Sequence, residues 1–64
     1  MIERVWVDIP DESSLMIDGR WVGESIRDAD GKWPWTYTDG DVIRRGLEDT
    51  RELAKASIMK EVGK

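Results

Sequence analysis

The side chains best suited to chemistry are four carboxylates, Asp28, Asp30, Asp39 and Asp41, which surround two Asp-Gly pairs. Clustered carboxylates can bind a metal ion or carry out acid–base catalysis. A calcium loop counted from Asp28 reaches Asp39 at its last position, but it lacks the intermediate acceptors and the required glycine. The chain has no Cys and no His, which excludes sites built from them. We therefore expect no enzyme activity, no metal and no cofactor, and we expect these Asp residues to stabilise turns.

A second group with chemical potential is aromatic. Trp33, Trp35 and Tyr37 alternate with other residues in the segment 33–37, so an extended strand places all three on one face. Such a face either forms a core from a few large side chains or anchors a partner. Pro34 has no N–H for a β-ladder, which predicts either that this strand lies at an edge of the sheet or that it turns its proline side to solvent. In either case we expect an indole that a partner can reach. Over the four Trp of the chain, we expect some to lie under a helix and at least one to be exposed.

These side chains must be positioned by short strands. Asp-Gly occurs three times, at Asp18, Asp30 and Asp39, with spacings of nine to twelve residues. Asp-Gly favours type I′ hairpin turns, and this spacing is typical of a β-meander. The predicted strands are residues 2–9, 20–27 and 32–38, with a possible fourth at 41–47. Residues 10–17 are compatible with a loop, a helical turn or a strand.

The last element is predicted to be a helix over residues 50–62. Its start is indicated by a capping-box pattern from Asp49 to Glu52, with Thr50 as an equally good cap. One stripe at helical spacing would face the sheet: Leu53, Ala54, Ser57, Ile58, Glu61 and Val62. The sequence thus predicts one small α+β domain over residues 1–64, a three- or four-stranded antiparallel meander with one C-terminal helix packed on one face. Nothing in the chain is available to cover the other face.

Charge is distributed unevenly. Residues 1–43 carry ten acidic and four basic side chains, a net of −6, and residues 44–64 carry four and six, a net of +2, which together give −4. An acidic sheet steers basic partners toward it and repels phosphate backbones. No apolar run approaches the roughly 18 residues needed to span a membrane, and the N-terminus lacks the pattern of a signal peptide. We expect a cytoplasmic protein with no membrane partner.

Two resemblances follow from short motifs in residues 21–62. A strand that ends in an acidic glycine turn at 26–31, the aromatic segment 33–37, and Gly46 before a Thr-capped helix with Ala54 resemble HicB-like antitoxin domains. That resemblance implies a sheet-plus-helix fold and a basic, RNA-cleaving protein partner.

The second resemblance begins at Gly19-Arg20-Trp21. Together with the Asp-Gly turns and the Thr-led helix, this motif is similar to the arm-binding domains of phage tyrosine integrases. That resemblance implies DNA binding through basic strands, whereas the sheet half of this chain is acidic.

The function predicted from the sequence is that of a small acidic, non-enzymatic protein-binding module. It would inhibit or regulate a partner with a basic surface, such as a nucleic-acid-processing enzyme, in the manner of an antitoxin or of a phage-encoded anti-defence protein. The predicted contact residues are Trp21, Trp33, Trp35, Tyr37, Glu24, Asp28, Asp30, Asp39 and Asp41. The alternative is a nucleic-acid or nucleotide-binding domain that uses the aromatic face and a basic patch of Arg44, Arg45 and Arg51. Self-association through the open sheet face or a sheet edge is a third expectation.

Overall fold

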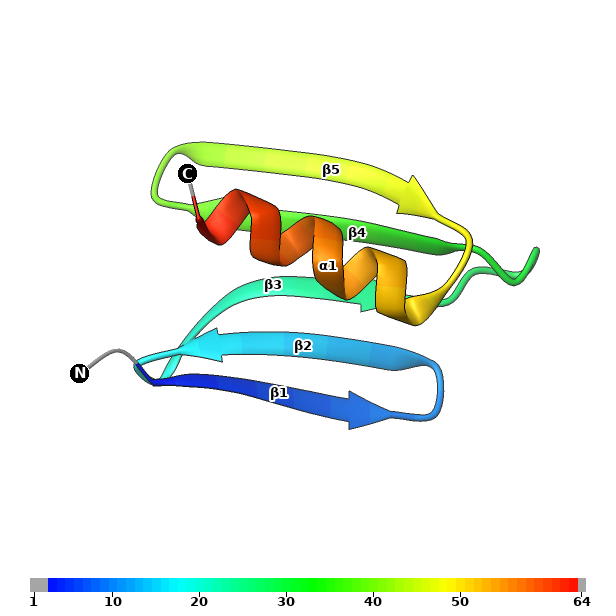
Figure 1. The fold of residues 1–64 in the computed structure, drawn as a ribbon, viewed down its shortest axis with the longest axis horizontal. Helices are drawn as coiled ribbons and strands as arrows, with labels where there is room; N and C mark the ends of the chain where they lie inside the picture. The colour runs from blue at the N-terminus through cyan, green and yellow to red at the C-terminus, as the bar shows by residue number, and fades with distance from the viewer. Residues whose placement is uncertain (1–2, 64) are drawn as a thin grey trace.

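The computed structural model describes residues 3–63 as one antiparallel sheet followed by one helix (Figure 1). The elements are β1 (Arg4–Ile9), β2 (Glu12–Ile17), β3 (Arg20–Ile26), β4 (Trp33–Asp39), β5 (Val42–Glu48) and α1 (Arg51–Val62). The strands lie in chain order across a five-stranded sheet, so the fold is a meander. The predicted α+β fold with one C-terminal helix is confirmed, but the prediction of three or four strands is wrong. Ile2 of the predicted first strand lies outside the described residues.

The additional strand is β2, in the region where the sequence left three alternatives open. Its side chains alternate between the two sheet faces, with Ser13 and Leu15 fully buried on one of them. The apolar alternation that marks a strand is weak here because a serine takes one of the inward positions. The possible fourth strand is present as β5.

The turns differ from one another, although all three contain Asp-Gly. Asp18 and Gly19 both have positive φ, 52° and 78°, as a type I′ turn requires. In the hairpin between β4 and β5, Asp39 already pairs with Val42. Gly40, with a φ of 60°, is therefore the first turn residue, as in type II′. Gly31, with a φ of 79°, lies in a longer loop between β3 and β4. The type I′ prediction is therefore confirmed at one of three sites.

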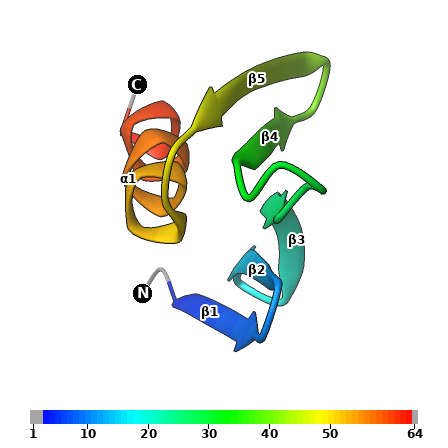
Figure 2. The same ribbon diagram turned by 90° about the vertical axis from the view of Figure 1, so that its right-hand side faces the viewer.

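The helix lies against one side of the sheet, over β3, β4 and β5, and the sheet curves around it (Figure 2). Thr50 is the N-cap, and its hydroxyl accepts a hydrogen bond of 3.2 Å from the Leu53 N–H. Ala54 and Ile58 are the buried helix residues. They close a core formed with Leu15, Val22, Trp33, Trp35 and Tyr37. Leu53, which the stripe placed in this contact, is 50% exposed, because the buried side of the helix is centred on Ala54 and Ile58.

Pro34 does not mark an edge strand, so that one of the two alternatives is wrong. β4 lies between β3 and β5, and Pro34 pairs with Leu47 of β5. On the other side, the described pairing with β3 ends at Ser25 and Trp35. There the Ser25 hydroxyl donates a hydrogen bond of 2.8 Å to the Pro34 carbonyl. The Pro34 nitrogen, which carries no hydrogen, therefore faces the side where pairing with β3 has already ended. Its lack of an N–H costs the sheet no hydrogen bond.

A candidate protein-binding surface

The three aromatic residues of β4 lie in the core rather than on the surface. Trp33, Trp35 and Tyr37 are 8%, 9% and 8% exposed, and all three face the helix side. A Cβ on Gly46, the partner of Trp35 on β5, would lie 2.5 Å from the indole Nε1, so only glycine leaves room for this ring. Burial raises the pKa of the Tyr37 phenol. The expectation of an indole of this segment that a partner can reach is therefore corrected: all three side chains are buried between the sheet and the helix.

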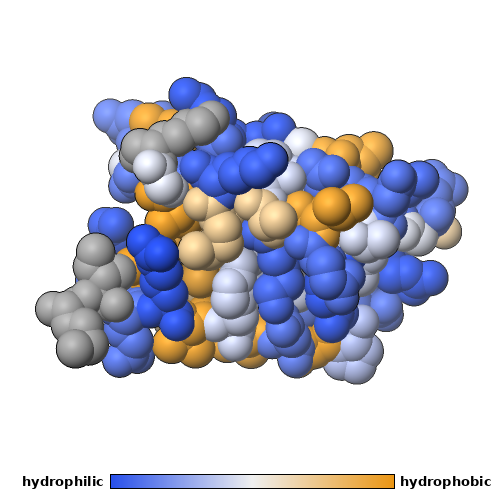
Figure 3. Space-filling model, in the orientation of Figure 1, coloured by the Kyte–Doolittle hydropathy of each residue, from blue (hydrophilic) through white to orange (hydrophobic). Residues whose placement is uncertain are grey.

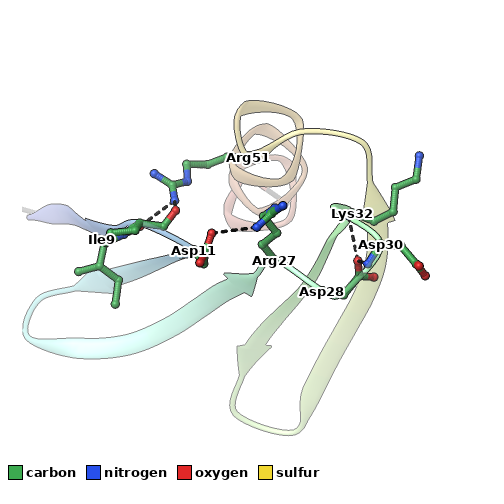
Figure 4. Close-up of polar contacts among 8 residues, drawn as sticks. Ile9, Asp11, Arg27, Asp28, Asp30, Lys32 and Arg51 are labelled. Carbon is green, nitrogen blue, oxygen red and sulfur yellow. Dashed lines mark hydrogen bonds and ion pairs between the residues drawn. The ribbon is translucent and has the colours of Figure 1, made fainter.

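The predicted acidic residues do not form one patch. Asp28 and Asp30 lie in the loop before β4, whereas Asp39 and Asp41 lie at its far end, about 20 Å away along a strand of this length. The Asp28 carboxylate accepts hydrogen bonds of 2.9 Å from the backbone N–H groups of Asp30 and Lys32, as Figure 4 shows. Asp28 thus stabilises its own turn.

The basic residues of the alternative prediction are also separated. Arg44 and Arg45 are neighbours on β5 and therefore point to opposite faces of the sheet. Arg44 lies on the helix side, where its Nε is 3.7 Å from Glu61. Arg51 donates hydrogen bonds to the carbonyls of Ile9 and Pro10, at 2.7 and 2.5 Å (Figure 4). No shared basic patch results from these three residues.

The side of the sheet away from the helix, called the open face below, carries the exposed apolar residues. Its members come from all five strands: Val5, Val7, Ile9, Glu12, Ser14, Met16, Trp21, Glu24, Ile26, Pro34, Thr36, Thr38, Ile43, Arg45 and Leu47. Leu47 and Trp21 are the most exposed of its large apolar side chains, at 60% and 58%. The helix-bearing side, by contrast, is mostly hydrophilic (Figure 3). The apolar surface is therefore concentrated on the one side that nothing in the described chain covers.

Strand register arranges the open face in three rows. Val7, Ser14, Glu24, Thr36 and Arg45 face one another across the strands and form a mainly polar middle row. The rows on either side are mainly apolar: one holds Ile9, Glu12, Ile26, Pro34 and Leu47, the other Val5, Met16, Trp21, Thr38 and Ile43. Charges on this face are thus few and flanked by apolar side chains.

Trp21 separates two hollows on the open face. Its indole N–H donates a hydrogen bond of 3.0 Å to the Gly23 carbonyl, which fixes the ring against its own strand. One hollow, of about 280 Å³, is lined by Val7, Ile9, Glu12, Ser14, Met16 and Trp21. The other, of about 360 Å³, is lined by Trp21, Val22, Gly23, Glu24, Thr36 and Thr38. Each hollow combines the indole wall with one glutamate, a suitable setting for an apolar anchor beside a cation.

Two cations of the helix, Lys55 and Arg51, reach across to β1 at the far edge of the sheet. Lys55 Nζ lies 2.8 Å from the Asp8 carboxylate and 4.7 Å from the centre of the Trp6 ring. Arg51 binds the carbonyls at the end of β1 and stacks 4.7 Å from the centre of the Trp33 ring. Because outward residues of β1 form one side of the open face, these contacts help to set the shape of that surface.

The Lys55–Asp8 pair predicts a small acid dependence of stability. The hydrogen bond from Lys55 is the main reason why the pKa of Asp8 lies below its ordinary value of 3.8. A lowered folded-state pKa stabilises the fold above the ordinary value, and this contribution is lost as the pH falls through the lowered pKa. Asp8→Asn should therefore lose less stability between pH 6 and pH 3 than the wild type, by under about 1 kcal/mol for a partly exposed pair. Urea melts across that range measure the difference; Asp41→Asn, an exposed carboxylate in the turn between β4 and β5, is the control.

Among residues 3–63, no group of three or more acidic side chains lies close enough together to hold a metal ion. In the same part of the chain, the one helix is too short and too polar to cross a membrane. Comparisons with protein-family models, with curated proteins and with solved structures gave no match.

Sequence reasoning found two members of this surface and missed the rest. Trp21 and Glu24 were predicted contacts and lie on the open face. The apolar residues Val5, Val7, Ile9, Ile26, Ile43 and Leu47 were missed. One signal could have found the first three: they alternate with Trp6, which packs against the core, so they must point to the other face.

Proposed function

We propose that this chain is a non-enzymatic protein-binding module and that it binds its partner through the open face. The observation that supports this most directly is the exposed apolar surface around Trp21, with a hollow on each side of the indole. A contiguous apolar surface on a small folded domain is typical of an interaction site. Trp is also among the residues that most often carry the binding energy of an interface.

The partner we propose has a basic surface. Glu12 and Glu24 contribute a carboxylate to the two hollows, and the chain carries a net charge of −4. Such a distribution attracts a cationic partner and raises its association rate. A nucleic-acid-processing enzyme, whose own surface is cationic, is the partner class that fits, and the module would inhibit or regulate it. An antitoxin or a phage-encoded inhibitor of host defence acts in this way.

Nucleic-acid or nucleotide binding has less support. A stacking platform needs exposed aromatic rings next to a cationic groove. Here the three aromatic residues of β4 are buried, and Arg44, Arg45 and Arg51 lie apart. Trp21 is the exposed indole, and the charged side chain beside it in the larger hollow is Glu24. No observation therefore favours this function over protein binding.

Trp21→Ala tests the proposed function. The substitution removes an exposed side chain, so the domain should stay folded and melt close to the wild type. Binding of the partner should weaken by about 2 kcal/mol or more, as for a central interface anchor. The measurement is affinity capture from nuclease-treated extract of the source cells, followed by titration of each captured protein with wild-type and variant chains.

Leu53→Ala is the matched control, because Leu53 is an equally apolar, half-exposed residue on the helix. It should capture the same protein with unchanged affinity. Equal binding by the Trp21→Ala variant would contradict the proposal. So would a partner that is lost when the extract is treated with nuclease.

A further inference from the structure

One half of the open face has a self-complementary pattern of charge. In the middle row, Glu24 on β3 and Arg45 on β5 lie on either side of Thr36, roughly 10 Å apart across two strand spacings. Within residues 3–63 neither of the two charged side chains has an ion-pair partner. Arg45 is also the only cation among the open-face residues. The open face thus presents one carboxylate and one guanidinium in the same row across the strands, neither of them in an ion pair, with apolar residues in the rows on either side.

The apolar neighbours of these charges match as well. Glu24 lies between the outward residues Trp21 and Ile26 on β3. Arg45 lies between Ile43 and Leu47 on β5. Each strand therefore presents an apolar residue, a charge and an apolar residue, with opposite charge on the two strands. β4 runs between them and presents Pro34, Thr36 and Thr38.

We propose that this half of the open face, formed by β3, β4 and β5, binds a second copy of the chain. A two-fold axis parallel to β4 and above Thr36 places β3 of each copy over β5 of the other. Glu24 then faces the partner's Arg45, and the reciprocal pair forms on the other side of the axis. Ile26 meets the partner's Leu47, and Trp21 meets the partner's Ile43. Face-to-face sheets pack about 10 Å apart with mean strand directions within about 30° of each other, and an axis parallel to β4 satisfies this limit and keeps residues near the axis in register.

Other placements of the axis are disfavoured by charge. An axis along β3 would place Glu24 over the same residue of the other copy. An axis along the middle row would place both Glu24 and Arg45 over the same residue of the other copy. Since each chain carries a net charge of −4, a dimer must offset repulsion between copies. The axis above Thr36 does so with two ion pairs of opposite charge.

This dimer leaves the rest of the open face free. β1 and β2 extend beyond β5 of the second copy, so the hollow beside Glu12 remains accessible on both chains. The dimer would then display two such hollows facing away from the shared axis. The dimer covers Trp21 and the hollow beside Glu24, so a partner protein would reach only the hollow beside Glu12 on each dimeric chain, whereas a monomer would offer both hollows.

Charge reversal tests the dimer. Sedimentation velocity of the wild type should show twice the monomer mass at concentrations of tens to hundreds of micromolar. Glu24→Arg or Arg45→Glu alone should raise the dissociation constant at least tenfold, because each creates two like-charge contacts. The double variant, Glu24→Arg with Arg45→Glu, should restore the dimer. Glu12→Arg is the matched control for Glu24→Arg: it changes the net charge equally on the same face but outside the dimer, and should leave the dimer intact.

A cysteine crosslink gives a second readout that does not depend on the charged residues. The chain has no Cys, so Thr36→Cys introduces a single thiol next to the proposed axis. A short bismaleimide should link two such chains, whereas Val7→Cys, on the free half, should remain unlinked. A wild type that stays monomeric at several hundred micromolar would overturn the proposal. A dimer that survives both single charge reversals would overturn it too, because another surface or a strand edge would then hold the copies together.

Discussion

Trp35→Ala is expected to unfold the domain. The indole is 9% exposed, lies between the helix and the sheet, and covers Gly46 of the neighbouring strand. Truncation of a buried Trp to Ala costs about 3–5 kcal/mol, and a domain of 64 residues has a total stability of roughly 3–10 kcal/mol. Thermal and urea melts followed by circular dichroism should show a variant that is unfolded, or nearly so, at room temperature.

Two controls separate packing from other effects of this substitution. Trp35→Phe keeps an aromatic ring over Gly46 and removes the buried indole N–H, which has no hydrogen-bond partner. Loss of an unsatisfied N–H offsets part of the lost packing, so this variant should remain folded. Trp21→Ala deletes the same side chain from the open face and should melt near the wild type. If Trp35→Ala melted like Trp21→Ala, the placement of Trp35 in the core would be wrong.

The behaviour of the aromatic strand explains what the sequence could and could not predict. The alternation of Trp33, Trp35 and Tyr37 correctly predicts one shared face. It does not say which face the helix covers, because Trp is equally suited to a core and to an interface. The deciding residues are distant in sequence: Gly46 leaves room for Trp35, and Gly23 lets Ile58 approach β3 closely. Such cross-element fits appear only once the strands are in register.

The sequence predicts three or four strands and misses β2 for a related reason. β2 carries serines at two consecutive positions, Ser13 and Ser14, both of which are buried. A polar residue at an inward position removes the periodic signal, although the position itself is structural. β3 adds a second difficulty, since its register with β2 shifts next to Leu15. Simple alternation along β3 therefore does not assign its faces, and Val22 and Gly23 are both buried.

The candidate site was predictable only in part. Composition establishes the acidic charge, and the predicted contacts Trp21 and Glu24 lie on the open face. The other acidic residues were grouped because they are close in sequence, yet a strand of seven residues separates Asp30 from Asp39. Arg44 and Arg45 are adjacent in sequence and lie on opposite faces. Charged residues that are close in sequence therefore need not share a surface. The alternation of side chains along a strand has to be applied to charged residues as well as to apolar ones.

Ile58→Ala is expected to be the most damaging substitution in the helix. Ile58 is fully buried, and its Cγ2 approaches the position that a Cβ on Gly23 would occupy to 2.8 Å. Glycine at position 23 cannot fill the space left behind, so the cavity persists and the loss should be about 2–5 kcal/mol.

Leu53→Ala distinguishes this packing from helix propensity. Both substitutions replace a larger apolar residue by Ala, the best helix former, so neither should weaken the helix itself. Leu53 is 50% exposed, and its truncation should cost well under the Ile58 value, about 1 kcal/mol or less, as for surface changes. Urea midpoints of the two variants measure the difference. Equal losses would show that the helix packs through both residues and that its orientation on the sheet differs from the one described.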